Sequence, residues 1–250
     1  MELDITFFAF AIPAVLFAGV SKGGFGSGAA FAAAPLLALI LPPAQAIGLM
    51  LPLLMIMDVT ALRAFWRRWN WPVARVMMIG AVPGVVLGAG LYSVANADVL
   101  RFLIGSVAIG FVAYQLARAR GWLRLEGRRP FPGAGYFWGG MAGFTSFISH
   151  AGGPPAAVYL LTRGLDKTTY QATTVLVFTA INLYKSGFYF ALGIFTADTL
   201  WAGVFLVPVA FGGVFLGVWL HKVVSEKFFF GITYVFLTIT GAKLIFDALT

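Results

Sequence analysis

The chain has 250 residues, of which 60% are hydrophobic and only 10% are charged, whereas a soluble domain typically carries about 25% charged residues. This composition excludes a soluble globular protein and indicates an integral membrane protein. The chain has no cysteine and two histidines, so disulfide bonds, thiolate metal sites and cysteine nucleophiles are excluded, and we expect no metal and no cofactor. The formal net charge of +8 indicates basic loops at a membrane surface and no nucleic-acid partner.

The first apolar region, residues 4–42, is too long for a single membrane span, which needs about 17 to 25 residues. It is interrupted at residues 21–28 by SKGGFGSG, which places a lysine and four glycines between two apolar runs. A lysine at bilayer depth costs between about 2.5 and well over 10 kcal/mol, and glycine-rich backbone cannot satisfy its own polar groups in lipid. We therefore expect a broken hairpin, either re-entrant or fully spanning, with SKGGFGSG at its tip.

The rest of the chain contains six apolar runs of membrane length and a second broken region. The predicted spanning helices cover residues 44–62, 73–93, 98–117, 168–191, 199–220 and 228–248. Residues 131–162 are again too long for one span and are broken by SHAGGPP at 149–155, which predicts a second hairpin. The expected fold class is an all-α polytopic membrane protein.

The basic residues predict the orientation, because cytoplasmic loops collect lysine and arginine. Most of them lie in the loops at 63–75, 118–129, 163–167 and 222–227, and the connections at 40–47, 92–98 and 192–199 carry none. With the basic loops inside, the first hairpin must begin and end outside, and the second must begin and end inside. Both chain termini are then expected outside the cell.

Two halves of the chain resemble each other. GVVLGAGL at 84–91 matches GVFLGVWL at 213–220, and RFLIG at 101–105 matches KFFFG at 227–231. A further match pairs Gln45 with Gln171, which a helix cap or interhelical hydrogen bond explains as well as binding does.

These matches predict a first repeat at 1–117, a basic cytoplasmic linker at 118–130 and a second repeat at 131–250. Each repeat is a hairpin plus three helices. Because that gives an odd number of crossings, the second copy is expected to be inverted in the membrane. Inverted repeats with broken segments at matching positions are typical of secondary transporters whose site lies near the midplane.

Both hairpin tips carry glycines and hydrogen-bond donors suited to an oxyanion. The candidate substrate-binding residues are Ser21, Lys22, Gly23, Gly24, Gly26, Ser27, Gly28, Ser149, His150, Gly152 and Gly153, with Ser146 as a further donor. A helix resuming at Ala29 would direct free N–H groups and a positive dipole end at the first tip. Pro154 or Pro155 suits the first helical position of the second tip. The alternative is that the glycines only permit close helix packing.

Asp58 lies inside the predicted helix 44–62, where an ionisable residue is a functional candidate by default. Its structural alternative is an ion pair with Arg63 or Lys185. Asn182, Tyr184 and Lys185 occupy the corresponding stretch of the second half, and Lys185 could equally pair with Asp58 or contact substrate. These residues are the candidates for coupling or ion pairing.

Four stretches of the chain closely resemble the sulfite exporter TauE/SafE family. They are GVSKGGFGSGAAFAAAPLLAL, PLLMIMD, GGMAGFTSFISHAGGPPAAVYLL and YQATTVLVFTAINLYK, and the resemblance covers essentially the whole chain. It implies a permease of the bacterial cytoplasmic membrane that exports sulfite or an organosulfonate such as sulfoacetate.

The resulting hypothesis is a secondary transporter, not an enzyme, that exports a small sulfur oxyanion by alternating access. The chain has no GxxxxGK[ST] phosphate loop, so ATP is not expected to power it directly. The expected partners are a small anionic substrate and the lipid bilayer, and a homodimer is left open. The alternatives are a carrier of another small anion, such as a carboxylate, and a non-transporting membrane scaffold or assembly factor.

Overall fold

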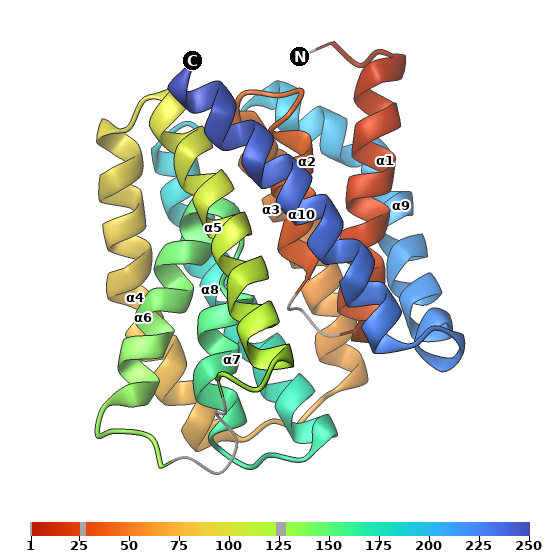
Figure 1. The fold of residues 1–250 in the computed structure, drawn as a ribbon. Helices are drawn as coiled ribbons and strands as arrows, with labels where there is room; N and C mark the ends of the chain where they lie inside the picture. Colours follow the sequence, from red (N-terminus) through yellow and green to blue (C-terminus); the bar gives the residue numbers. More distant parts are fainter. Residues whose placement is uncertain (1, 26–28, 124–128) are drawn as a thin grey trace.

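The computed structural model describes residues 2–25, 29–123 and 129–250. Every regular element within these ranges is helical, which confirms the all-α fold class (Figure 1). Three residues predicted for the first hairpin tip, Gly26, Ser27 and Gly28, lie outside the described residues.

The first half of the chain forms a hairpin followed by three long helices. Its elements are α1 (Ile5–Val20), a π-helical turn (Ser21–Phe25), a 3₁₀ turn (Ala30–Ala32), α2 (Ala33–Leu37), α3 (Pro43–Ala64), α4 (Trp71–Val94) and α5 (Ala97–Ala119). The second half repeats this order. Its elements are α6 (Ala134–Ser149), α7 (Gly153–Leu161), α8 (Lys167–Ala191), α9 (Ala197–Val223) and α10 (Glu226–Leu249). The long helices begin and end within a few residues of the predicted spans.

Polar residues in the connections set where the long helices begin, because their side chains accept hydrogen bonds from N–H groups of the first turn. Asn70 accepts from Val73 N at 3.1 Å at the start of α4, and Asn96 accepts from Val99 N at 2.8 Å at the start of α5. Asp166 caps α8, and hydrogen bonds from Thr169 lower the pKa of its carboxyl. The sequence therefore marks these boundaries locally.

Length and composition identify helices able to cross a membrane, and within the described residues they are Ile5–Phe25, Pro43–Ala64, Trp71–Val94, Ala97–Ala119, Ala197–Leu220 and Phe228–Leu249. Ile5–Phe25 was expected as half of a hairpin, yet it is long enough to span by itself. The predicted span 168–191 is α8, which has full length but is not apolar enough to be included, because threonine, glutamine, asparagine and lysine residues interrupt it. α8 packs against α3 and α4. Several of its polar residues, among them Thr173, Asn182 and Lys185, are buried inside the bundle.

The two ends of the bundle differ in the loops they carry (Figure 1). Both termini lie at one end, together with the connections that have no basic residues. α1 runs into the bundle and α2 returns toward that end, whereas α6 and α7 make the same excursion from the opposite end. The basic loops after α3, α5, α7 and α9 gather at this opposite end. The segregation matches the charge argument, and the side that faces the cytoplasm stays a prediction.

Each hairpin packs against a helix of the other half. α1 and its π-helical turn lie against α9, and α6 lies against α4. Backbones approach closely at both contacts: a Cβ on Gly84 would lie 1.9 Å from Gly140 O, and one on Gly217 would lie 2.4 Å from Val20 O. Small residues permit such approach between membrane helices. Such reciprocal packing is expected of an inverted repeat, and the inverted repeat and its boundaries stay predictions.

The orientation can be tested by single cysteines, since the chain has none of its own. Val94, 82% exposed, lies at the end that carries the termini, and Leu123, 41% exposed, follows α5 at the basic end. We expect a membrane-impermeant maleimide to label Val94→Cys in intact cells and Leu123→Cys only after permeabilisation. The opposite labelling pattern would place the basic loops outside and overturn the charge argument.

Candidate functional site

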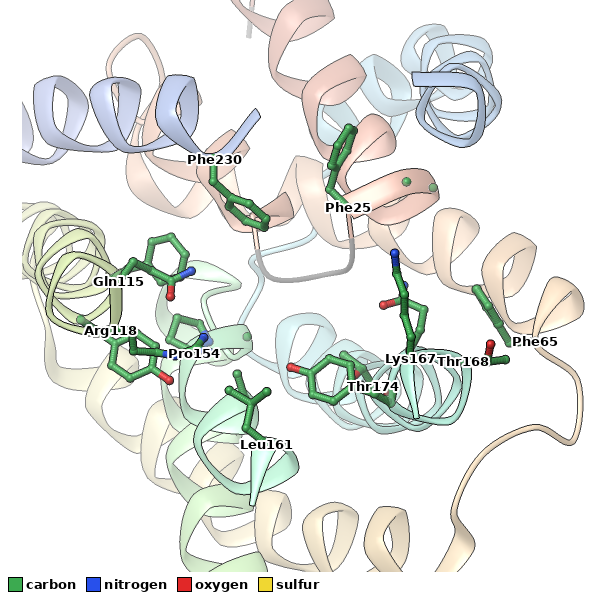
Figure 2. Close-up of a pocket in the computed structure, with 18 residues that line it drawn as sticks. Phe25, Phe65, Gln115, Arg118, Pro154, Leu161, Lys167, Thr168, Thr174 and Phe230 are labelled. Carbon is green, nitrogen blue, oxygen red and sulfur yellow. Dashed lines mark hydrogen bonds between the residues drawn. The ribbon is translucent and has the colours of Figure 1, made fainter. Parts of the chain in front are cut away.

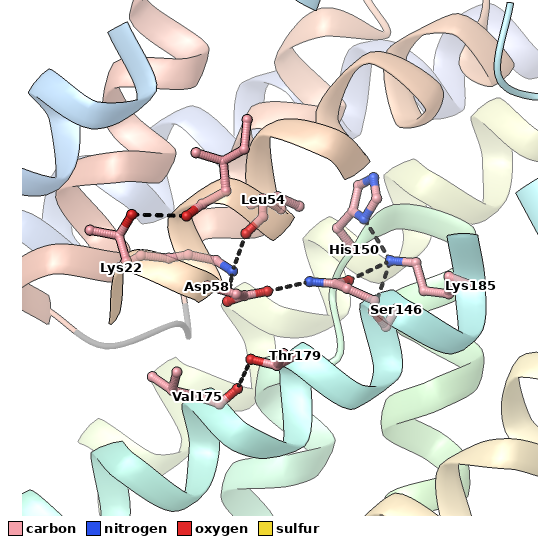
Figure 3. Close-up of polar contacts among 11 residues, drawn as sticks. Lys22, Leu54, Asp58, Ser146, His150, Val175, Thr179 and Lys185 are labelled. Atoms are coloured by element: carbon pink, nitrogen blue, oxygen red, sulfur yellow. Dashed lines mark hydrogen bonds and ion pairs between the residues drawn. The ribbon is translucent and has the colours of Figure 1, made fainter. Parts of the chain in front are cut away.

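A chain of buried polar side chains crosses the centre of the bundle (Figure 3). Its members in order of contact are Lys22, Asp58, Asn182 and Lys185, and both His150 and Ser146 contact Lys185. They come from the π-helical turn, α3, α8 and the end of α6. Hydrogen bonds therefore connect the tip of the first hairpin with the tip of the second.

The first link is an ion pair between Lys22 and Asp58. Lys22 Nζ donates to Asp58 Oδ1 and lies 3.3 Å from Leu54 O. Asn182 Nδ2 donates to Asp58 Oδ2 at 2.6 Å. Lys22 is only 6% exposed and Asp58 only 1%, so both charges are buried and each depends on its partners.

Lys185 is the second buried lysine and is fully enclosed, with 0% exposure. Its Nζ lies 3.1 Å from Ser146 Oγ, 3.2 Å from Asn182 Oδ1 and 2.7 Å from His150 Nδ1. An ammonium has three N–H donors and no acceptor, so these neutral groups use all three. Lys185 therefore joins Asp58 through the Asn182 amide and not by direct pairing.

His150 closes the chain at the second hairpin tip. Its Nε2 lies 3.0 Å from Ile47 O, and a carbonyl can only accept, so Nε2 carries the hydrogen. Nδ1 of the neutral ring is then free to accept from Lys185. His150 ends α6 with φ of 58°, in the left-handed region that residues other than glycine seldom adopt. Contacts to α3 and α8 hold it there.

The buried chain contains more basic than acidic residues. Among the described residues, the buried lysines are Lys22 and Lys185, and the buried carboxylate is Asp58. Asp58 is paired with Lys22, and the hydrogen bonds of Lys185 are made with Ser146, His150 and Asn182. A low-dielectric interior makes each of these groups depend on its partners.

A cavity of about 790 Å³ lies between the two hairpin tips and the basic end of the bundle (Figure 2). Gly23, Gly24 and Phe25 of the first tip and Gly153 and Pro154 of the second contribute to its wall. Further polar lining comes from Tyr114, Gln115, Arg118, Lys167, Thr168, Tyr170, Gln171 and Thr174. None of the described lining residues is acidic. Hydrogen-bond donors therefore share the wall with apolar side chains such as Phe65 and Leu161.

One donor in the cavity wall has no partner. The Oη atom of Tyr114 is excluded from solvent and makes no hydrogen bond within the described part of the chain. The Arg118 guanidinium lies over the same ring, 6.0 Å from its centre. A buried unsatisfied hydroxyl in a native structure calls for an explanation, and a bound acceptor would supply one.

The polar chain lies beyond the cavity, toward the end with the termini. Lys22 directly precedes Gly23 of the cavity wall, Asp58 lies about two turns along α3 from Phe65, and Asn182 lies about two turns along α8 from Thr174. An anion that left the cavity in this direction would approach the hairpin tips and the polar chain.

The structure brings most of the predicted coupling residues together and corrects their pairing. Asp58 pairs with Lys22, not with Arg63, which is exposed, or with Lys185. Lys22 is paired with Asp58 in this structure, and its expected role in substrate binding stays a prediction. Asn182 and Lys185 belong to the chain. Among the described contacts, Tyr184 packs half-buried against the apolar core instead of joining it.

The helices at the two hairpin tips begin at other residues than predicted. The first hairpin resumes with a 3₁₀ turn from Ala30 and the five-residue helix α2, not with a helix from Ala29. α7 begins at Gly153, so Pro154 and Pro155 occupy the next two positions and offer no N–H groups. The start of α7 is therefore poor in backbone donors for an anion.

The remaining tip residues divide between packing and the cavity wall. A Cβ on Gly23 would lie 2.2 Å from Val214 O, and one on Gly152 would lie 2.6 Å from the Phe178 ring, so close packing requires both glycines. Gly24 and Gly153 line the cavity. Ser21 is fully buried, as is Ser149, whose hydroxyl donates to Thr145 O at 3.3 Å.

Sequence reasoning singled out Gln171 but missed the rest of the polar lining of the cavity. Arg118 and Lys167 were counted only as loop charges. Yet Tyr114, Gln115 and Arg118 recur at helical spacing on α5. Lys167, Tyr170, Gln171 and Thr174 do the same on α8. A polar stripe on one face of an otherwise apolar helix was the available signal.

A family model described as Sulfite exporter TauE/SafE matches residues 11–244 of the chain. No curated protein and no solved structure matches it.

The buried ion pair predicts strongly coupled effects on stability. Lys22→Met and Asp58→Leu should each lower the free energy of unfolding by about 3–5 kcal/mol, because each leaves the other charge buried without its partner. The double variant should be more stable than either single one. Thermal melting of the detergent-purified variants measures this. The exposed pair Lys243–Asp247 on α10 is the control, and the same substitutions there should cost about 0–1 kcal/mol. Additive losses at Lys22 and Asp58 would contradict the pairing.

Proposed function

The chain belongs to the sulfite exporter TauE/SafE family, and from this membership we propose that it exports a small sulfur-containing oxyanion across the bacterial cytoplasmic membrane by alternating access. The observation that carries the proposal is the donor-lined cavity between the two hairpin tips. The six helices long and apolar enough to span a membrane, counted among the described residues, fit the multi-pass membrane protein that this family implies.

The lining of the cavity favours an oxyanion. Arg118 supplies a guanidinium and Lys167 an ammonium, and the hydroxyl and amide groups of Tyr114, Gln115 and Gln171 can all donate hydrogen bonds. Sulfite and sulfonate oxygens only accept, and charge-assisted bonds to them are the stronger kind. A cavity of about 790 Å³ holds a hydrated sulfite ion or an organosulfonate such as sulfoacetate.

The position of the cavity fits the loading step of an exporter. Arg118 and Lys167 belong to the basic end of the bundle, which the positive-inside rule places in the cytoplasm. Substrate would enter there and meet the hairpin tips, with the polar chain beyond them. Release on the other side then requires the tips to move and the chain from Lys22 to His150 to rearrange.

Two alternatives use the same features differently. The two oxygens of a carboxylate also accept hydrogen bonds, so a carrier of a small carboxylate would need similar donors. A membrane scaffold needs neither a cavity with hydrogen-bond donors in its wall nor buried ionisable side chains, both of which cost stability. The structure therefore favours transport, and competition between anions separates the two carriers.

Reconstituted protein tests the proposal. We expect proteoliposomes containing the wild type to transport radiolabelled sulfite, with sulfonates competing better than carboxylates of similar size. Arg118→Gln and Lys167→Gln should each raise the KM by about tenfold, because each removes one charge-assisted hydrogen bond. Lys243→Gln, an exposed lysine on α10, should leave transport unchanged.

Three outcomes would count against the proposal. Preferential competition by carboxylates would indicate the carboxylate carrier. Absence of transport and of any anion-dependent thermal stabilisation would indicate the scaffold. An unchanged KM in both cavity variants, with transport intact, would place the loading site away from Arg118 and Lys167.

A further inference from the structure

The carboxylate of Asp58 is held in the way that proteins hold a bound oxyanion (Figure 3). One oxygen accepts from the Lys22 ammonium and the other accepts from the Asn182 amide at 2.6 Å. The group is almost completely buried, with 1% exposure of the residue. Charged and amide donors that converge on a buried carboxylate form a site for any small anion of the same shape.

Groups other than Asp58 hold these donors in place. Lys185 donates to the Asn182 oxygen at 3.2 Å, so the Asn182 N–H₂ group must face away from Lys185 and toward Asp58. Lys185 is fixed in turn by Ser146 and His150. Lys22 also contacts Leu54 O at 3.3 Å. The donor arrangement would therefore persist if the carboxylate moved away.

The burial of Lys22 favours the exchange of one anion for another. Lys22 is only 6% exposed, and Asp58 is its charged partner among the described contacts. An oxyanion beside Lys22 and Asn182 would replace the carboxylate when Asp58 withdraws. The exchange avoids an unpaired lysine in a low-dielectric interior.

The position of this cluster next to the cavity indicates a role on the transport path. It lies directly beyond the tip residues that end the cavity, and within the described residues it contains the buried lysines of the bundle. A substrate anion that moves from the cavity toward the end with the termini therefore meets these lysines next.

We propose that Lys22 and Asn182 form a second anion site on the transport path, that Asp58 occupies it in the absence of substrate, and that the transported oxyanion displaces the Asp58 carboxylate. The proposal deepens the proposed function and rests on it for the identity of the natural anion. The existence of the site itself depends only on the geometry of the cluster.

Formate tests the site directly, because it matches the carboxylate that Asp58→Ala removes. Formate should raise the melting temperature of purified Asp58→Ala in a saturable manner, and should have no such effect on the wild type, whose own carboxylate occupies the site. Lys22→Met/Asp58→Ala should lose the effect, since the charge that holds formate is gone. Asp247→Ala, in the exposed pair with Lys243, controls for general salt effects.

The same experiment also decides the case in which Asp58→Ala does not fold without added formate. Recovery of folded Asp58→Ala only from formate-containing buffer would support the site, and failure to recover it in either buffer would count against it. Folded Asp58→Ala that melts at the same temperature with formate and with chloride would overturn the proposal.

Asp58→Asn separates displacement from a purely structural ion pair. Without the competing carboxylate, it should bind sulfite about ten- to a hundredfold more tightly than the wild type, while transport turns over more slowly because nothing displaces the anion. Weaker or equal binding would contradict displacement. If the natural substrate is not sulfite, the formate effect in Asp58→Ala still appears, so failure of the site and failure of the proposed function give different results.

Discussion

The ion pair between Lys22 and Asp58 is the interaction on which the centre of this protein depends. Both charges lie in an interior that does not tolerate an unpaired ion, and the two residues belong to different elements, the first hairpin turn and α3. Asn182 and Lys185 extend the pair through α8 to His150 at the second tip. The requirement that each buried polar group find a partner thus fixes the position of both hairpin tips.

Different forces hold the hairpins and their tips. Backbone contacts between glycine-rich faces hold α6 against α4 and α1 against α9, where an added methyl group at Gly84 or Gly217 would collide with carbonyl oxygen. Such packing has one arrangement and resists small displacements. The tips meet through hydrogen bonds, which can be exchanged for bonds to another acceptor. This division suits a rigid frame around a centre that can switch between two sets of partners.

The sequence predicts the helices better than the site. Long apolar runs and capping residues such as Asn96 mark the helix boundaries locally, and the breaks at both hairpins follow from glycine and proline. Ionisable residues in apolar runs identify Asp58 and Lys185 as candidates. Their partners cannot be deduced in this way, because Asp58 meets Asn182 across 124 positions of sequence. Arg118 was overlooked because the positive-inside rule already explained its charge.

The buried carboxylate beside Lys22 also bears on how an anion can leave. Without Asp58, Lys22 and Asn182 would hold an oxyanion strongly in a low-dielectric interior, and a transport site must bind weakly enough to release its ion. Asp58 competes for Lys22, so the gain from binding substrate is reduced by the loss of the internal pair. On the proposed path, the aspartate lowers the affinity of the central site and gives the lysine a partner after release. The same residue thus stabilises the empty protein and keeps the site from trapping its substrate.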